Sequence, residues 1–242
     1  MQETRKNVSR RDMLGALTAV GAAALASCGS SSPTSPSNNT GTSSGTTTGG
    51  GTSNSCAVIA SETAGPYPDR TGMINNAAFY RQDITEGRPG VPLLLRLKVV
   101  DASTCRPIKG AAVDIWHADA RGVYSGFGPG RGSRTFMRGI QRTDRTGLAR
   151  FQSVYPGWYQ GRTVHIHVKV HVAGNVVHTG QLYFPDKVTD RVFRRKPYSR
   201  RPRRTTRNAD DFVFAQGGRR SMLALRKVGG AYVGSIALGV TR

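Results

Sequence analysis

Apolar and polar residues alternate along much of the chain after about residue 90, which is typical of β-strands with one buried face. In the segment AAVDIWHAD, the alternation places Val113 and Ile115 on one face and Asp114 and Trp116 on the other. The ranges expected to form strands are 91–102, 111–119, 147–154, 162–174, 176–184 and 230–241. Turn-forming Gly, Pro, Asn and Asp lie between them, and no long segment has the helical period of about 3.6 residues. The pattern predicts an all-β fold, a β-sandwich of mostly antiparallel strands with long loops.

The first 55 residues lack this alternation. SRRDML, residues 9–14, is a twin-arginine motif, and the apolar stretch after it is too short to span a membrane. That stretch ends in LASC, which resembles a bacterial lipobox and makes Cys28 the expected lipidation site; in the alternative, cleavage occurs nearby and Cys28 is incidental. Residues 29–55 carry no charge and no large apolar side chain, so they cannot fold. The expected segments are a signal peptide at 1–27, an anchor cysteine with a disordered linker at 28–55, and a folded domain at 56–242.

These N-terminal features predict where the protein works. We expect export by the Tat route, followed by lipid anchoring at the outer face of the cell membrane or by secretion, with the lipid as the only membrane contact. Disulfides persist in such compartments. With Cys28 assigned to the lipid, Cys56 and Cys105 remain to form a disulfide, and two free thiols are the alternative.

The net charge of +21, from 35 basic and 14 acidic residues, is concentrated in one segment. Residues 187–207 carry ten basic residues against one acidic residue. The composition predicts a long solvated loop, which adds solubility or attracts an anionic surface. We do not expect recognition of nucleic acid, because an exported protein seldom meets DNA.

Two histidines stand one residue apart in the expected strand at 162–174. His165 and His167 would point to the same face, where two imidazoles form half of a metal site or are ordinary strand residues. His171 lies farther along the strand, too far to share an ion with them. His117 and His178 are expected to be structural, and Trp116 is expected in the core.

Tyrosines lie where they could complete a metal site. Tyr159 lies six residues before His165, and Tyr124 follows the expected strand that contains Trp116. A phenolate is a hard, anionic oxygen donor, so two phenolates with two imidazoles suit Fe(III) and suit zinc or copper poorly. The sequence contains neither a CxxC nor an HExxH motif. Whether Tyr183 lines a pocket or packs in the core stays open.

Five ordered blocks then carry a resemblance, from about Glu62 to the C-terminus: ETAGPYPD, VDIWHADARGVY, TDRTGLARF, YPGWYQGRTVHIHVKV and TGQLYFPD. Together they resemble the intradiol ring-cleavage dioxygenases, in particular the iron-bearing subunit of protocatechuate 3,4-dioxygenases and its secreted single-chain relatives. The resemblance implies a non-haem Fe(III) cofactor and long loops that carry the active site. The implied metal ligands are Tyr124, Tyr159, His165 and His167.

The resemblance also implies roles around the metal. Tyr159 would leave the metal and take a proton when substrate binds. Arg162 would stabilise negative charge on the substrate, and Gln181 would line the pocket for substrate and O2. The segment Gly65, Pro66 and Tyr67 would close over the ring.

The implied reaction opens a catechol-type ring between its two hydroxylated carbons with O2 and gives a muconate-type diacid. Neither an organic cofactor nor a nucleic acid partner is implied. The preferred catechol and the oligomeric state stay open. A non-catalytic β-sandwich of the transthyretin-like or carboxypeptidase-regulatory-like type is the alternative; it explains the strands but not Tyr124, Tyr159, His165 and His167 together.

Overall fold

The computed structural model describes residues 56–68, 73–127 and 132–242. The expected signal peptide, the lipidation site Cys28 and the linker lie outside the described residues. Within the described ranges, no helix is both long and apolar enough to cross a membrane.

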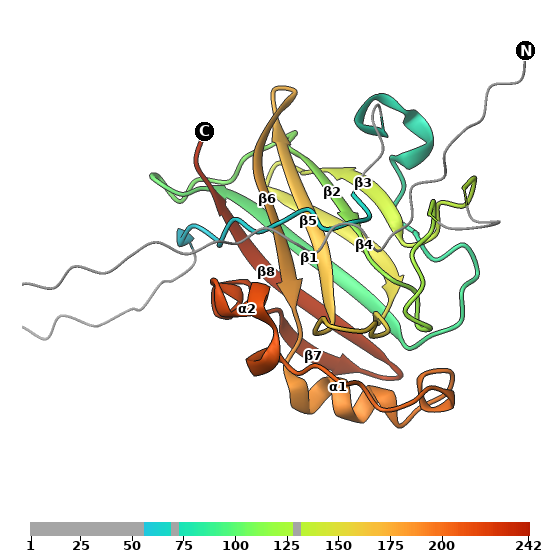
Figure 1. The fold of residues 1–242 in the computed structure, drawn as a ribbon. Helices are drawn as coiled ribbons and strands as arrows, with labels where there is room; N and C mark the ends of the chain where they lie inside the picture. The colour runs from blue at the N-terminus through green and yellow to red at the C-terminus, as the bar shows by residue number, and fades with distance from the viewer. Residues whose placement is uncertain (1–55, 69–72, 128–131) are drawn as a thin grey trace, which may run out of the picture. The chain divides into compact units, whose positions relative to one another are not determined.

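Within these described residues, eight strands form two four-stranded sheets (Figure 1). The strands are β1 (Pro92–Asp101), β2 (Ala112–Trp116), β3 (Arg138–Arg142), β4 (Leu148–Val154), β5 (His165–Val172), β6 (Asn175–Tyr183), β7 (Ala224–Val228) and β8 (Ala231–Val240). The first sheet has the order β4-β1-β8-β7 and the second has the order β3-β2-β5-β6. Neighbouring strands run antiparallel except for β1 and β8, which are parallel. The predicted all-β sandwich of mostly antiparallel strands is confirmed.

The core lies between the two sheets. In β1 the buried and exposed residues alternate, so that Leu93, Leu95 and Leu97 point inward. The second sheet contributes Val113, Ile115, Ile166, Val168 and Val170. Each such side chain stabilises the fold by about 1.5–3 kcal/mol when it leaves water. The alternation in the sequence therefore sets which face of each strand enters the core.

The second sheet is buried on both faces. All five residues of β2 are buried, although alternate residues point to opposite sides. On the face away from the core, Trp116, Ala118 and Tyr124 form a second apolar cluster, packed against Tyr67 and Tyr159. Loops therefore cover the outer face of this sheet, and that face carries His165 and His167.

Strands β3 and β7 are absent from the sequence-based expectation, and both lie at sheet edges. Strand β3 has the sequence RGIQR and β7 has ALRKV, and neither shows a clear apolar alternation. Short, charged edge strands are common because they discourage pairing with other chains. Their position at the edge, rather than their own pattern, accounts for their structure.

The prediction that residues 187–207 form one long solvated loop is wrong. The segment begins inside helix α1 (Asp186–Phe193), and it continues through a 3₁₀ turn at Tyr198–Arg200. The Arg204 side chain is only 5% exposed, because it forms ion pairs with Asp186 and Asp190. The helix was missed because it is short and buries only Thr189 and Val192.

The other short helices follow the same scheme of brief turns between strands. Helix α2 spans Phe212–Ala215 and lies with α1 at the end of the sandwich where β6 ends (Figure 1). The remaining 3₁₀ helices are Met73–Asn75, Ala77–Phe79, Asn208–Asp210 and Gly218–Ser221.

A disulfide joins Cys56, at the start of the described domain, to Cys105, in the turn after β1. Their Cα atoms lie 5.1 Å apart, within the usual range for this bond. The bond ties the beginning of the domain to the first sheet, as the cysteine assignment predicts.

Candidate active site

His165 and His167 project from the first residues of β5 onto the loop-covered face of the second sheet. Their Nε2 atoms lie 3.2 Å apart. In the sheet register, His167 stands between Trp116 of β2 and Gln181 of β6, and His165 stands beside Tyr183. The strand period therefore brings both imidazoles together with side chains from the two neighbouring strands, β2 and β6.

The proton of His165 is fixed by a backbone contact. Its Nδ1 lies 2.7 Å from the carbonyl oxygen of Thr163, which can only accept, so Nδ1 carries the proton. Nε2 is then a free lone pair, and the hydroxyl of Tyr159 donates to it at 3.0 Å. Burial lowers the pKa of His165 to about 3, so the ring is neutral, which is the state in which imidazole binds metals.

His167 is held by packing. Its ring stacks on Trp116, with centroids 4.9 Å apart and planes 4° from parallel. Gly65 lies against the other side, so close that a Cβ atom there would stand 2.8 Å from Cε1 of His167. Burial lowers the pKa of His167 well below its usual value, so this imidazole is neutral as well.

Tyr124 reaches the histidines from the turn after β2. The Asp119 carboxylate accepts from the backbone N–H groups of Arg121 and Val123, which fixes this turn. The Tyr124 ring lies 6.1 Å from that of His167, and its buried hydroxyl has no hydrogen-bond partner among the described residues. Burial raises the pKa of the phenol well above 10, so the Tyr124 hydroxyl is neutral.

Tyr159 reaches the cluster from the turn before β5. Its ring centroid lies 5.6 Å from those of Tyr124 and His165. The preceding residue, Trp158, donates from its indole to the Pro202 carbonyl at 3.1 Å, and its own carbonyl accepts from Arg201 at 2.5 Å. The arginine-rich segment therefore supports the turn that carries Tyr159.

The four side chains could hold one metal ion together. Among the described residues, no group of three or more His, Cys, Asp or Glu could do so. Any metal centre here therefore depends on the phenol oxygens of Tyr124 and Tyr159, beside the two histidines.

Arg162 lies at the turn between Tyr159 and β5. Its Nε donates to Asp211 at 2.9 Å, and its Nη2 donates to the side-chain oxygen of Gln181 at 2.6 Å. Burial would lower the pKa of Arg162, but the Asp211 carboxylate outweighs it and raises the pKa above its usual value. The guanidinium is thus a permanent, oriented positive charge beside the metal-ligand candidates.

The segment that contains Gly65, Pro66 and Tyr67 contacts the cluster through its glycine and its tyrosine. Tyr67 packs on Tyr124 with ring centroids 4.8 Å apart, whereas Pro66 is exposed. The buried Arg138 of β3 donates to the Tyr67 carbonyl at 3.1 Å and to the carbonyl of Ser125, beside Tyr124, at 3.2 Å. One arginine thus joins two of the site's loops.

The part of the chain that carries these side chains is similar to known proteins. The family described as "Dioxygenase" matches residues 63–198 of the chain, a range that contains all four metal-ligand candidates and Arg162. The intradiol ring-cleavage dioxygenase from Tetranychus urticae is 32% identical, with 77% of this chain and 95% of that chain covered and a TM-score of 0.71. The chain belongs to the intradiol ring-cleavage dioxygenase family.

Two further proteins are similar to the chain. The dioxygenase domain of a dioxygenase carbohydrate-binding protein fusion from Streptomyces sp. SirexAA-E is 30% identical, with 74% of this chain and 96% of that chain covered and a TM-score of 0.55. Catechol 1,2-dioxygenase from Acinetobacter baylyi is 33% identical over 89 residues, or 36% of this chain. The match spans 28% of the length of that curated relative.

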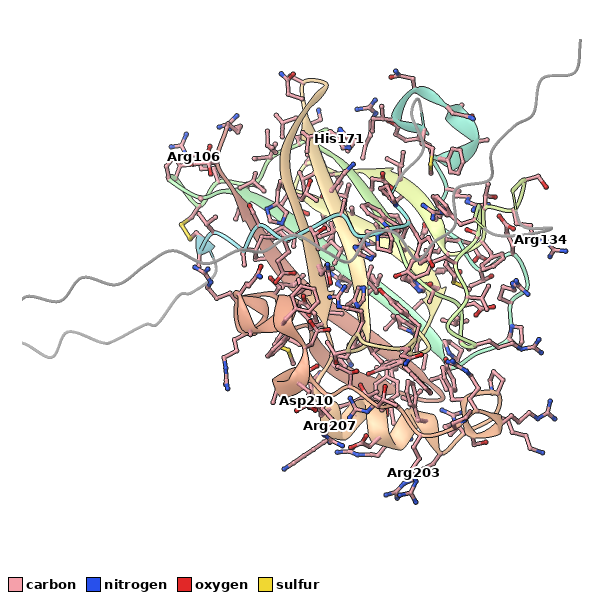
Figure 2. All side chains as sticks on the ribbon, in the orientation of Figure 1. Arg106, Arg134, His171, Arg203, Arg207 and Asp210 are labelled. Atoms are coloured by element: carbon pink, nitrogen blue, oxygen red, sulfur yellow. A yellow bond between two sulfur atoms is a disulfide. The ribbon has the colours of Figure 1, made fainter. Side chains whose placement is uncertain are left out.

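The other histidines lie outside this candidate site. His117 is buried and hydrogen-bonds to the Ala118 carbonyl and to the Ser153 hydroxyl, both at 2.8 Å. His178 is buried farther back on β6. His171 lies near the end of β5 that is remote from α1 (Figure 2), past a register shift between Val170 and His171.

Three residues of the site escaped sequence reasoning. Asp211 holds Arg162, Glu62 accepts a hydrogen bond from Tyr183, and Trp116, expected in the core, forms one wall of the histidine pair. Asp211 carried one local signal, an acidic residue before the apolar FVFA, which is typical of a helix N-cap. Nothing near it in the sequence indicated a contact with Arg162.

Proposed function

We propose that the protein is an intradiol dioxygenase that cleaves catechol-type rings between the two hydroxylated carbons with O2. The observation that carries this proposal is the convergence of Tyr124, Tyr159, His165 and His167 on one buried point, within a chain of this family. A non-catalytic β-sandwich module would leave that convergence without a purpose.

We infer non-haem Fe(III) as the cofactor. Two neutral imidazoles and two phenols that become anionic on binding match a hard, highly charged cation. The buried Tyr124 hydroxyl supports this assignment, because a metal cation would give its oxygen a partner. When bound, the ion would act as a Lewis acid toward the catechol and make its ring reactive toward O2.

Tyr159 is the candidate proton acceptor. Its hydroxyl donates to His165 at 3.0 Å, so its Oη already lies in the hydrogen-bond network of the site. A catechol must lose its hydroxyl protons to bind as an anion, and a Tyr159 phenolate could hold one of them. Tyr124 is more deeply buried than Tyr159.

Arg162 and Gln181 would face the substrate ring. Arg162 stays charged because its ion pair with Asp211 offsets the effect of burial on its pKa. It can therefore stabilise negative charge that develops on the ring carbon under attack. Gln181 is held on both sides: its oxygen accepts from Arg162, and its Nε2 donates to the Thr63 carbonyl at 3.0 Å. Pre-organised groups of this kind need no rearrangement during the reaction.

We also propose that the enzyme works outside the cytoplasm, exported by the Tat route and anchored through lipidated Cys28 or secreted. The motif SRRDML and the LASC sequence support this location, and the Cys56–Cys105 disulfide suits an oxidising compartment. Cell fractionation of the wild-type chain and of Cys28→Ala tests it. Retention of Cys28→Ala in the membrane fraction would contradict lipid anchoring.

Oxygen uptake with a panel of catechol, protocatechuate and hydroxyquinol tests the activity. We expect consumption of O2 with at least one of these and a muconate-type diacid as product, with strong loss in Tyr159→Phe. Tyr80→Phe is the matched control, because Tyr80 donates to Ile74 far from the site. Iron-loaded, folded protein that consumes no O2 with any catechol would overturn the proposal.

A further inference from the structure

Glu62 is a buried carboxyl group in contact with Tyr183, and the proposed reaction gives it no role. Glu62 is 8% exposed, and its backbone N–H donates to the carbonyl oxygen of Thr179 in β6 at 3.0 Å. Its Oε2 lies 2.8 Å from the hydroxyl of Tyr183, and its Oε1 is buried as well. Burial favours the protonated form of a carboxyl group, and the protonated form can donate a hydrogen bond.

The contacts continue from Glu62 to Arg162 in one chain. The Tyr183 hydroxyl lies 3.3 Å from the side-chain oxygen of Gln181, which accepts from Arg162 at 2.6 Å. Arg162 in turn donates to Asp211. A change at Glu62 can therefore reach the groups that face the substrate.

The direction of this chain depends on one proton. When Glu62 is ionised, Tyr183 donates its only proton to Glu62, and the lone pairs of Tyr183 and Gln181 face each other. When Glu62 is protonated, it can donate to Tyr183, which then donates to Gln181, so that every link is satisfied. The neutral form of Glu62 thus fixes Gln181 and Arg162 more firmly than the charged form.

We propose that Glu62 is a positioning residue whose protonation state, transmitted through Tyr183 and Gln181, controls how tightly the pocket binds a catechol. The inference rests on the proposed function. The neutral state favours binding for a second reason as well: a charged Glu62 would repel an anionic catechol in a poorly solvated site.

The charges around Glu62 support this role. Burial raises its pKa from 4.5 to about 7, against the opposing effects of the Tyr183 hydrogen bond and the Arg162 charge; the Asp211 carboxylate raises it further. These three groups face Glu62 from β6, from the turn before β5 and from the cap of α2. The switch therefore lies at about neutral pH.

An infrared titration of the protein without substrate tests the protonation directly. We expect the band of a neutral carboxyl group that disappears as the pH rises through about 7, and we expect this band to be missing in Glu62→Gln. Asp83→Asn is the matched control, since Asp83 is exposed and its side chain accepts from Thr85. A wild-type spectrum without this band, or a Glu62→Gln spectrum that keeps it, would overturn the proposal.

Steady-state kinetics tests the link to binding. The side-chain amide that Glu62→Gln introduces can donate to Tyr183 at every pH, so it imitates the protonated carboxyl. The ratio of KM in wild type to KM in Glu62→Gln should be near one at about pH 6 and rise about tenfold by about pH 8.5, while the kcat ratio stays level. Using the ratio cancels the ionisation of the catechol itself.

The variant Tyr183→Phe tests whether the effect of Glu62 on KM passes through Tyr183. It removes the link between Glu62 and Gln181 but leaves the carboxyl, so most of the KM dependence should vanish while the infrared band remains. A KM ratio that is level across this pH range in Glu62→Gln would overturn the proposal. If no catechol is cleaved, the proposed function fails and the infrared titration still decides the protonation of Glu62.

Discussion

Arg162 donates to the carboxylate of Asp211 at 2.9 Å, although 49 residues separate the two along the chain. The Asp211 side chain is completely buried, and that of Arg162 is 11% exposed. The same carboxylate also accepts from the backbone N–H groups of Val213 and Phe214 at the start of α2. The pair therefore connects the Arg162 guanidinium to helix α2, which lies outside residues 63–198, the range that matches the family.

Asp211→Asn should weaken both the fold and the activity. In either orientation, the amide NH2 would face N–H donors, those of Arg162 and Thr163 or those of Val213 and Phe214. We expect a loss of roughly 3 kcal/mol in the free energy of unfolding and a fall of about 100-fold in kcat/KM. The neighbouring exposed Asp210→Asn is the control in urea denaturation and initial-rate assays. A change below about twofold in kcat/KM would contradict the role assigned to the pair.

Gly65→Ala should displace His167, and Gly87→Ala is its matched control. Both glycines have a positive φ, +70° and +69°, so each alanine costs about 1 kcal/mol in backbone strain. Only at Gly65 would the new Cβ meet another group, since nothing lies within 4 Å at Gly87. Urea denaturation and iron analysis should show a greater loss of stability and lower iron content for Gly65→Ala. Equal behaviour of the two variants would argue against close packing of Gly65 on His167.

The stability of the protein should depend on pH through Glu62. Because its pKa is about 7 in the folded protein and 4.5 ordinarily, the native state binds this proton more tightly than the unfolded state. The contribution of Glu62 to stability therefore falls as the pH rises from about 4.5 to about 7, and it is constant above that range. Urea denaturation at several pH values should show Glu62→Gln gaining stability relative to wild type across this window. A difference that does not vary with pH would contradict the raised pKa.

Removal of the Cys56–Cys105 disulfide should cost stability without changing the site. The bond closes a loop with a sequence separation of 49 residues, for which loop-closure entropy gives about 4 kcal/mol. The double variant Cys56→Ser, Cys105→Ser should lose about this much free energy of unfolding and keep its iron content. Unchanged denaturation in the presence and absence of reductant would contradict a structural disulfide.

The sequence predicts the parts of the site that depend on local periodicity. His165 and His167 share a face because side chains alternate along a strand, and the six expected strands occur within a few residues of their predicted bounds. Tyr124 and Tyr159 follow from the family resemblance and not from spacing. All four side chains meet on the second sheet.

The residues that the sequence did not reveal are those fixed by contacts between distant segments. Glu62 meets Tyr183 across 121 residues, and Arg138 meets Tyr67 across 71. No periodic pattern encodes such pairs, because each depends on how loops settle over the outer face of the sheet. Helix α1 was not predicted for a different reason. The many arginines of residues 187–207 indicated solvent, yet Arg204 folds back onto two acidic residues of the helix.

The binding of ferric iron to metal-free protein, followed by visible absorption, tests the central claim most directly. The account predicts about one iron per chain and a red-brown tyrosinate-to-iron band that Tyr124→Phe weakens and that Tyr80→Phe leaves intact. Circular dichroism would establish that each variant is folded. A folded wild-type protein that stays colourless and binds no iron would contradict the claim that Tyr124, Tyr159, His165 and His167 form a ferric centre.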